Sequence, residues 1–270
     1  MIQIDRVSRD FLSPEGRTYR ALNDVALEVA AGAFVAIVGP SGCGKSTLLN
    51  IVAGLAAPTT GAVRIDGREL AGLNRRATYM FQQDALLPWK NVRDNVALGL
   101  TLAGIARSDA DARADTWLAR VGLAPFATHY PAQLSGGMRK RVAMIQNWII
   151  DRDILLMDEP FSALDVHTRQ QMEEELLELW AGGLAPVASG FSRTKKTILF
   201  VTHDLEEAIA LADEVVVLSA GPASRVVVRH AVTLERPRDL LELRTQPAFL
   251  ELYRELWAVL RDEVIRSRRG

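Results

Sequence analysis

The glycine-rich stretch GPSGCGKST, residues 39–47, constrains this chain more than any other feature. An apolar run that begins at Phe34, FVAIVG, precedes it and is typical of a buried strand. The stretch STLLNIVAGL follows directly and has helical spacing. Strand, glycine-rich turn and helix are the context in which Gly-x-x-x-x-Gly-Lys-Ser forms a phosphate-binding loop. The sequence therefore predicts a phosphate site on residues 39–47.

The residue types of this loop suit a chain of phosphates. Glycines let the backbone curl so that N–H groups point inward, and the following helix adds the positive end of its dipole. Lys45 can reach the β and γ phosphates, and Ser46 can ligate Mg²⁺. We expect contacts with the ligand from every residue of the loop: Gly39, Pro40, Ser41, Gly42, Cys43, Gly44, Lys45, Ser46 and Thr47.

Further apolar runs predict the architecture around this loop. Buried strands are expected around Leu155, Leu199 and Val216, with helical patterns between them. Such alternation indicates a parallel sheet with both faces covered. The region 88–150 carries mostly helical signals, so we interpret it as an inserted helical subdomain. The expected boundaries are 1–87 and 151–234 for an α/β core, 88–150 for this subdomain and 235–270 for a C-terminal helical extension, with an exposed Gly-, Ala- and Ser-rich loop at 181–196.

Composition limits the class of protein. With 32 basic and 33 acidic residues the net charge is −1, which gives no general basic field for nucleic acid. The single cysteine, Cys43, excludes an intrachain disulfide and suggests a reducing compartment. No signal-peptide pattern is evident, and the longest nearly apolar run, residues 96–106, is shorter than the ~20 residues of a membrane-spanning helix. If the protein acts at a membrane, we expect it to bind there peripherally, without spanning the bilayer.

Two acidic residues and a histidine follow the predicted strands. Asp158 and Glu159 come after ILLM, and His203 ends ILFVT. Ligands of open α/β sheets bind at the carboxyl ends of the strands. Asp158 would hold Mg²⁺ through its water shell, Glu159 could act as a general base toward an attacking water, and His203 would contact a γ phosphate.

The stretch QLSGGMRKRVAM predicts a second helix start able to bind an anion. Ser135 has the character of an N-cap, and Gly136 and Gly137 leave the first N–H groups open. It could bind a separate anion, complete a nucleotide site in another copy of the chain, or be an ordinary capped helix. The following Met138 cannot donate a hydrogen bond and is not assigned to the site.

In this order, GPSGCGKST, LSGGM, ILLMDEP, SALD and VTHD resemble the ATP-binding subunits of ABC transporters, over residues 2 to 235. The resemblance implies an α/β P-loop NTPase core with a mixed, mainly parallel sheet and an inserted α-helical subdomain. It implies ATP and Mg²⁺ as cofactors and ATP hydrolysis as the activity. It also implies a head-to-tail homodimer, in which each ATP lies between one chain's phosphate loop and the other chain's Ser135, Gly136 and Gly137.

The resemblance assigns further positions. Gln82 resembles the glutamine that links Mg²⁺ and the attacking water to the membrane partner, although Gln83 is adjacent. Asp165, in SALD, resembles a residue that crosses the dimer interface. Phe11 stands where the family places an aromatic that stacks on adenine; Tyr19 is an alternative, and Phe11 could also be a plain core residue.

The implied roles divide into catalysis and metal binding. The catalytic residues are Glu159, His203, Lys45 and Gln82, and the metal residues are Ser46, Gln82 and Asp158. Because Cys43 lies inside the loop, we expect alkylation of its thiol to inactivate the protein and ATP to protect it.

Three segments are most similar to those of bacterial nitrate, sulfonate and taurine importers: FQQDALLPWKNVRDNVALGL, LSGGMRKRVAM and EEAIALADEVVVLSAGPA. This implies a peripheral protein on the cytoplasmic face of the inner membrane. Its partners would be a second copy, two transmembrane permease subunits and, indirectly, a solute-binding protein, but no nucleic acid. LLPWKNVRDN would line the groove for a permease helix, with Trp89 either an anchor there or a core tryptophan.

Two other interpretations come from different classes. A soluble ABC-type ATPase acting on nucleic acid or ribosomes would show a coiled-coil or zinc-binding insertion, a second cassette or a basic face. A small-molecule kinase would need an acceptor pocket and no LSGGM. At the C-terminus, the apolar spacing from Phe249 to Val264 predicts a helix that packs on its own domain or makes a dimer or regulatory contact.

Overall fold

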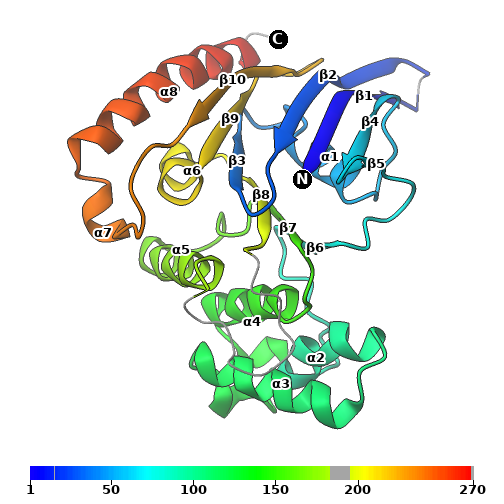
Figure 1. Ribbon diagram of the computed structural model, residues 1–270, viewed down its shortest axis with the longest axis vertical. Helices are drawn as coiled ribbons and strands as arrows, with labels where there is room; N and C mark the ends of the chain where they lie inside the picture. Colours follow the sequence, from blue (N-terminus) through cyan, green and yellow to red (C-terminus); the bar gives the residue numbers. More distant parts are fainter. Residues whose placement is uncertain (15, 183–194, 269–270) are drawn as a thin grey trace.

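The computed structural model describes residues 1–14, 16–182 and 195–268 (Figure 1). Residues 183–194, which make up most of the loop expected at 181–196, lie outside the described residues, as do the last two residues of the chain.

A six-stranded sheet with the order β10-β9-β3-β8-β7-β6 forms the centre of the molecule. Five of its strands are parallel, and β10 runs antiparallel to β9 at one edge. The strands are β3 (Phe34–Val38), β6 (Ala77–Met80), β7 (Ile154–Asp158), β8 (Thr197–Val201), β9 (Glu214–Leu218) and β10 (Val226–Ala231). Every residue of β3 and β8 is buried, as expected for strands with both faces covered.

A separate four-stranded antiparallel sheet, with the order β2-β1-β4-β5, was not predicted. Its strands are β1 (Ile2–Leu12), β2 (Thr18–Val29), β4 (Thr60–Ile65) and β5 (Arg68–Glu69). Three register shifts interrupt the pairing of β1 with β2, so the apolar residues of β1 do not alternate regularly. The α/β fold with a mixed sheet is confirmed, but much of its antiparallel part forms this second sheet.

Alternate residues of β3 enter two different hydrophobic cores. Val35 and Ile37 pack with the antiparallel sheet and with α1 (Lys45–Val52). Phe34 and Ala36 pack in the other core, which the remaining helices cover. These helices are α2 (Val92–Leu102), α3 (Arg107–Arg120), α4 (Gly136–Trp148), α5 (Val166–Trp180), α6 (Leu205–Leu211), α7 (Leu240–Leu243) and α8 (Pro247–Ser267), with short 3₁₀ turns at Ala124–Phe126 and Pro131–Gln133.

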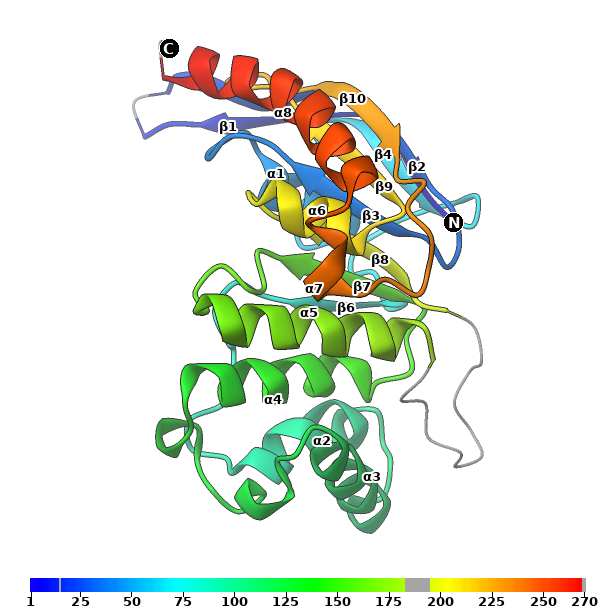
Figure 2. The ribbon, with the colours of Figure 1, turned by 90° about the vertical axis from the view of Figure 1, so that its left-hand side faces the viewer.

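Helices α2 to α5 lie in successive layers below the sheet in Figure 2, whereas α8 lies at the top of that view. Helix α5 is next to the sheet, α4 lies beyond α5, and α2 and α3 lie beyond α4. The boundaries drawn at 88 and 150 stay a prediction. Among the described residues, no helix combines the length and the apolar character needed to cross a bilayer.

The C-terminal helix α8 packs on its own chain, mainly against α6. Phe249, Leu256 and Leu260 are buried, whereas Tyr253 and Val264 are partly buried at the edge of the core. The expectation that this helix packs on its own domain is therefore confirmed.

Glu207 gives the fold a testable pH dependence. It lies on α6 and is 3% exposed. Burial raises its pKa to about 8, with Glu173 and Asp204 adding to the rise and the Thr202 hydroxyl opposing it. Between its ordinary pKa and about 8 the unfolded chain loses this proton while the folded chain keeps it, so stability falls as pH rises through that window.

We expect Glu207→Gln to remove this dependence, because the amide has no proton to lose. Calorimetry would measure the melting temperatures of the variant and the parent at pH 5 and at pH 8. The difference, variant minus parent, should be several degrees larger at pH 8 than at pH 5. An equal difference at the two pH values would contradict the assignment.

Candidate nucleotide site

The loop between β3 and α1 has the backbone form that an anion nest needs. Gly42 and Gly44 have φ values of 77° and 92°, a region that costs glycine little. Gly44 stands at the N-cap of α1, and no side chain caps this helix. The N–H groups of its first turn are therefore left for a ligand, which suits phosphate oxygens.

Lys45 lies across the loop. Its ammonium donates to the carbonyl oxygens of Gly39, at 2.8 Å, and Pro40, at 3.1 Å, and the residue is 5% exposed. These bonds fold the side chain back along the loop, so its charge lies beside the first residues of the loop.

Ser46 and Asp158 form an oxygen pair suited to Mg²⁺. The Ser46 hydroxyl donates to Asp158 Oδ1 at 2.9 Å, bringing together the start of α1 and the end of β7. Burial raises the pKa of Asp158, while the bonds from Ser46 and Tyr79 lower it. A hydroxyl and a carboxylate on rigid elements are ligands that Mg²⁺ accepts beside phosphate oxygens.

Glu159 and His203 meet at the same edge of the sheet. His203 Nδ1 lies 3.0 Å from Glu159 Oε2, although the two residues come from different strand ends. The parallel register sets this distance, because Asp158 of β7 pairs with Val201 of β8. Glu159 has a φ of 43°, and its N–H donates to the Val201 carbonyl oxygen at 2.8 Å. An acid held in such a backbone conformation is typical of functional sites.

Gln82 lies beside this pair rather than beside the metal residues. Its amide nitrogen is 3.5 Å from Glu159 Oε2 and 3.4 Å from Ser162 Oγ. The hydrogen bonds of the described residues do not join Gln82 to Ser46 or Asp158. Its role as a metal residue stays a prediction, as does the choice between Gln82 and Gln83, both of which are exposed.

Ser135, Gly136 and Gly137 are not gathered with these residues. Ser135 caps α4 by accepting a hydrogen bond from the Met138 N–H at 3.3 Å. Helix α4 lies beyond α5, in another layer from the phosphate loop (Figure 2). A Cβ at Gly137 would lie 2.6 Å from Thr168 Cγ2, so glycine there lets α4 approach α5 closely.

Asp165 is exposed at the start of α5. Its carboxylate accepts hydrogen bonds from the backbone N–H of Thr168 at 3.0 Å and from the Thr168 hydroxyl at 2.7 Å. These bonds lower the pKa of Asp165. Within one chain this carboxylate therefore acts as a helix cap, and its role across an interface stays a prediction.

Phe11 and Tyr19 are register partners across the β1–β2 hairpin. They are 41% and 46% exposed, so the interpretation of Phe11 as a core residue is wrong. The Arg9 guanidinium lies 4.8 Å from the centre of the Phe11 ring. The Tyr19 hydroxyl and the Gly42 carbonyl both lie beside Gly221, which places Tyr19 close to the middle of the phosphate loop. Both aromatics therefore stay candidates for stacking on a base.

The sequence analysis missed Tyr79 and Ser162. The Tyr79 hydroxyl donates to Asp158 Oδ2 at 3.2 Å, and Ser162 bonds the Glu159 carbonyl oxygen through its hydroxyl at 3.0 Å. Tyr79 stands in an apolar strand pattern, where nothing distinguishes it from a core aromatic. Ser162, three residues after Glu159, could have been noticed as part of the same turn.

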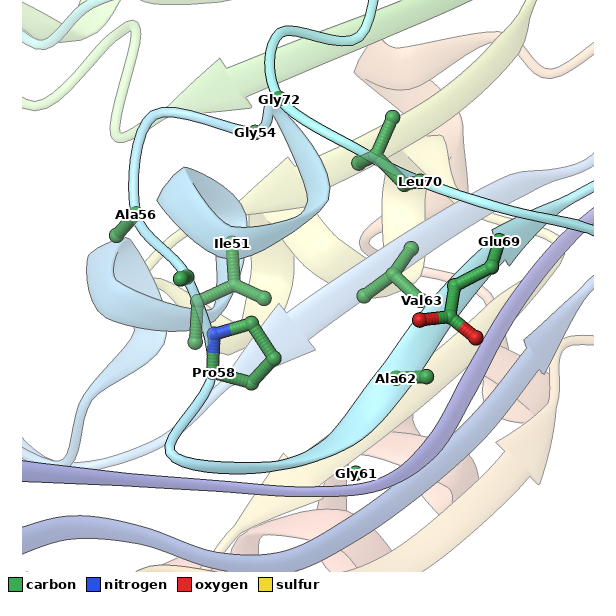
Figure 3. Close-up of a pocket in the computed structure, with 11 residues that line it drawn as sticks. Ile51, Gly54, Ala56, Pro58, Gly61, Ala62, Val63, Glu69, Leu70 and Gly72 are labelled. Atoms are coloured by element: carbon green, nitrogen blue, oxygen red, sulfur yellow. The ribbon is translucent and has the colours of Figure 1, made fainter.

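A small cavity near the end of α1 lies apart from the site (Figure 3). Its volume is about 150 Å³, and its walls include Ile51, Val63 and Leu70 together with several glycines and alanines. No residue assigned to the site lines it.

Cys43 faces the interior instead of the ligand side of the loop. Its side chain is fully buried in the core that contains α1, and burial raises the pKa of its thiol although the nearby Lys45 lowers it. This overturns the expectation that Cys43 is open to alkylation under the protection of ATP. Cys43 can meet a ligand only through its backbone.

We expect iodoacetamide to modify native Cys43 at least about tenfold more slowly than the same thiol in denaturant, because only the exposed thiolate reacts. Mass spectrometry would measure both rates, with and without ATP. Rapid modification of the native protein, strongly slowed by ATP, would refute the buried position.

Comparisons with known proteins identify the family. The ABC transporter family matches residues 22–162. The taurine import ATP-binding protein TauB of Rhizobium johnstonii is 42% identical over 272 residues, 99% of this chain and 99% of that protein. The nitrate import ATP-binding protein NrtD of Synechococcus elongatus is 38% identical over 256 residues, 94% of this chain and 89% of that protein.

A solved structure has the same fold. The ATP-binding cassette MJ0796, a dimer in a post-hydrolysis state bound to ADP and Pi, superposes with a TM-score of 0.73 at 31% identity and covers 87% of this chain and 100% of that one. Since the family match spans more than half of the chain and the relatives span nearly all of it, this chain belongs to the ABC transporter family as an ATP-binding subunit.

Proposed function

We propose that this chain is the ATP-hydrolysing motor of an importer for a small anion or sulfonate-like solute. The observation that carries the proposal is the grouping of Lys45, the Ser46–Asp158 pair and the Glu159–His203 pair at one edge of one sheet. The solute class comes from the relatives named for taurine and nitrate import. The membrane and binding-protein partners would select the solute.

Each group has a role in phosphoryl transfer to water. The backbone nest and Lys45 would bind the β and γ phosphates, and Ser46 and Asp158 would hold Mg²⁺, which neutralises charge on the phosphates. Glu159 would orient the attacking water and accept its proton, while His203 keeps that carboxylate in place at 3.0 Å. Catalysis by such a site consists mainly of positioning and charge stabilisation.

Two copies would complete the site. Ser135 and the open N–H groups at Gly136 and Gly137 belong to another layer of the same chain, so they are free to cap the nucleotide of a second copy. ATP would then hold two chains together, and hydrolysis would release them. The dimeric solved cassette supports this arrangement.

A mostly apolar groove of about 430 Å³ offers a docking place for a permease helix. It lies between the end of α1, strand β6 and helix α2. The exposed side chains of Leu55, Leu73, Phe81 and Leu102 are part of its lining. The expected segment LLPWKNVRDN does not line it, but Trp89 is 72% exposed, so the interpretation as a core tryptophan is wrong. We therefore move the proposed docking site to this groove and keep Trp89 as a separate candidate contact.

The proposed complex contains two copies of this chain and two permease subunits. The chain would lie peripherally on the cytoplasmic face of the inner membrane, and a solute-binding protein would deliver the solute from outside.

Glu159→Gln tests the motor directly. The amide can still fill the site but cannot accept a proton, so we expect ATP binding to persist while release of free phosphate falls at least about a hundredfold. Gel filtration with ATP should show the variant as a dimer. Lys45→Ala is the comparison, because it should lose both binding and hydrolysis.

Two outcomes would count against the motor. A Glu159→Gln variant that hydrolyses ATP at the parent rate would remove the proposed base. A parent protein that releases no free phosphate, but phosphorylates an added metabolite, would favour a kinase.

Leu102→Glu tests the groove. A charge in an apolar contact should abolish co-purification with the permease subunits while leaving the ATPase rate of the isolated chain within about twofold. Leu241→Glu is the matched control, because Leu241 is similarly exposed, 68% against 80%, and does not line the groove. Loss of the complex in both variants, or in neither, would reject this docking site.

A further inference from the structure

The segment that carries Gln82 is bound to the first turns of α4 by a buried lysine. Lys140 is 3% exposed. Its ammonium donates to the carbonyl oxygen of Gln82 at 2.6 Å and to that of Phe81 at 3.5 Å. It also lies 3.2 Å from Asp84 Oδ1. All of its partners therefore lie within four consecutive residues.

A buried ammonium is costly unless acceptors surround it. Burial lowers the pKa of Lys140, and the Asp84 carboxylate opposes that shift. An apolar side chain would fill the same space without this cost. Because a charged side chain stands at a position that an apolar one could fill, its hydrogen bonds to residues 81–84 point to a role beyond filling the core.

A second cation shares the same carboxylate. Arg139 lies 3.1 Å from Asp84 Oδ2 and donates to the Leu134 carbonyl oxygen at 2.8 Å. Asp84 therefore keeps a partner if Lys140 is replaced. The main-chain carbonyl of Gln82 would lose its side-chain partner. Among the described residues, Lys140 is the only one whose side chain donates to it.

The two ends of this connection are both parts of the proposed site. Lys140 lies five residues after Ser135, on the helix that Ser135 caps. The Gln82 amide lies beside Glu159 at 3.5 Å. The lysine thus ties the helix that would cap the nucleotide of a second copy to the backbone of the glutamine beside the candidate base.

We propose that Lys140 is a positioning residue for hydrolysis, which fixes the main chain at Gln82 to helix α4 through the hydrogen bond between its ammonium and the Gln82 carbonyl oxygen. This inference rests on the role proposed for Gln82. When two copies close on ATP, movement of α4 is transmitted through Lys140 to Gln82. Gln82 in turn lies beside Glu159, the residue proposed to orient the attacking water.

Lys140→Met separates this role from a purely structural one. Methionine has a similar length and suits a buried position, and Asp84 keeps Arg139. We expect the kcat for ATP hydrolysis to fall about ten- to a hundredfold, because a small misplacement of a positioning group costs that much. The KM for ATP should stay within about twofold, since the phosphate loop is untouched, and the melting temperature should not fall.

Lys196→Met is the matched control. Lys196 is a second lysine, partly buried, that donates to two main-chain carbonyl oxygens, those of Ile150 at 3.2 Å and Arg152 at 2.6 Å. Its burial lowers its pKa to about 8, and its segment carries no residue of the site. We expect its kcat to stay within about twofold of the parent. Lys140→Gln, an uncharged donor, should recover part of the rate lost in Lys140→Met.

The double variant with Gln82→Ala shows whether Lys140 acts through Gln82. We expect it to be no slower than Gln82→Ala alone, because the two changes remove one function. An unchanged kcat in Lys140→Met, an equal loss in Lys196→Met, or losses that multiply in the double variant would each overturn the inference. The inference would also be overturned if Lys140→Met melts at a lower temperature than the parent and Lys140→Gln recovers none of the lost rate.

Failure of the inference differs from failure of the proposed function. If Gln82→Ala and Glu159→Gln are both slow and Lys140→Met is not, only the inference is wrong. If Gln82→Ala hydrolyses ATP at the parent rate, the role of Gln82 is wrong and the inference falls with it.

Discussion

Parallel pairing of β3, β8 and β7 is the constraint on which the rest of the site depends. Parallel strands end at the same edge of a sheet, so three segments far apart in the chain deliver their polar residues together. The glycine loop leaves β3, Asp158 and Glu159 leave β7, and His203 leaves β8. Asp158 and Val201 are paired in register, so the residues that follow them, Glu159 and His203, leave the sheet side by side and their side chains meet.

The same topology bears on the proposal that two copies complete the nucleotide site. Helix α4 lies beyond α5 in Figure 2 and contacts the sheet at β6, and the hydrogen bonds of the described residues do not join Ser135 to the phosphate loop. What the chain does provide is a set of connections between the layers. Gly137 lets α4 and α5 approach closely, and Lys140 joins α4 to the Gln82 segment. In the proposed dimer, these connections would carry the meeting of two copies to the residues beside Glu159.

The sequence predicted those parts of the structure whose determinants are local. Helix α5 (Val166–Trp180) lies where a helical pattern was expected, between the strands around Leu155 and Leu199, and the glycine loop has the positive φ values that its glycines allow. The β1–β2 hairpin was missed because bulges break its alternation. The inward direction of Cys43 was missed because a turn sequence does not tell which face a side chain takes. The contacts of Tyr79 and Lys140 depend on partners 79 and 58 residues away, so no local pattern could reveal them.

The most direct test of the whole account is a structure of Glu159→Gln bound to ATP and Mg²⁺. The account requires two copies, with the γ phosphate of each ATP within hydrogen-bond distance both of Lys45 in one copy and of Ser135 in the other. A structure in which Ser135 is far from every nucleotide, in a monomer or in any other dimer, would contradict it.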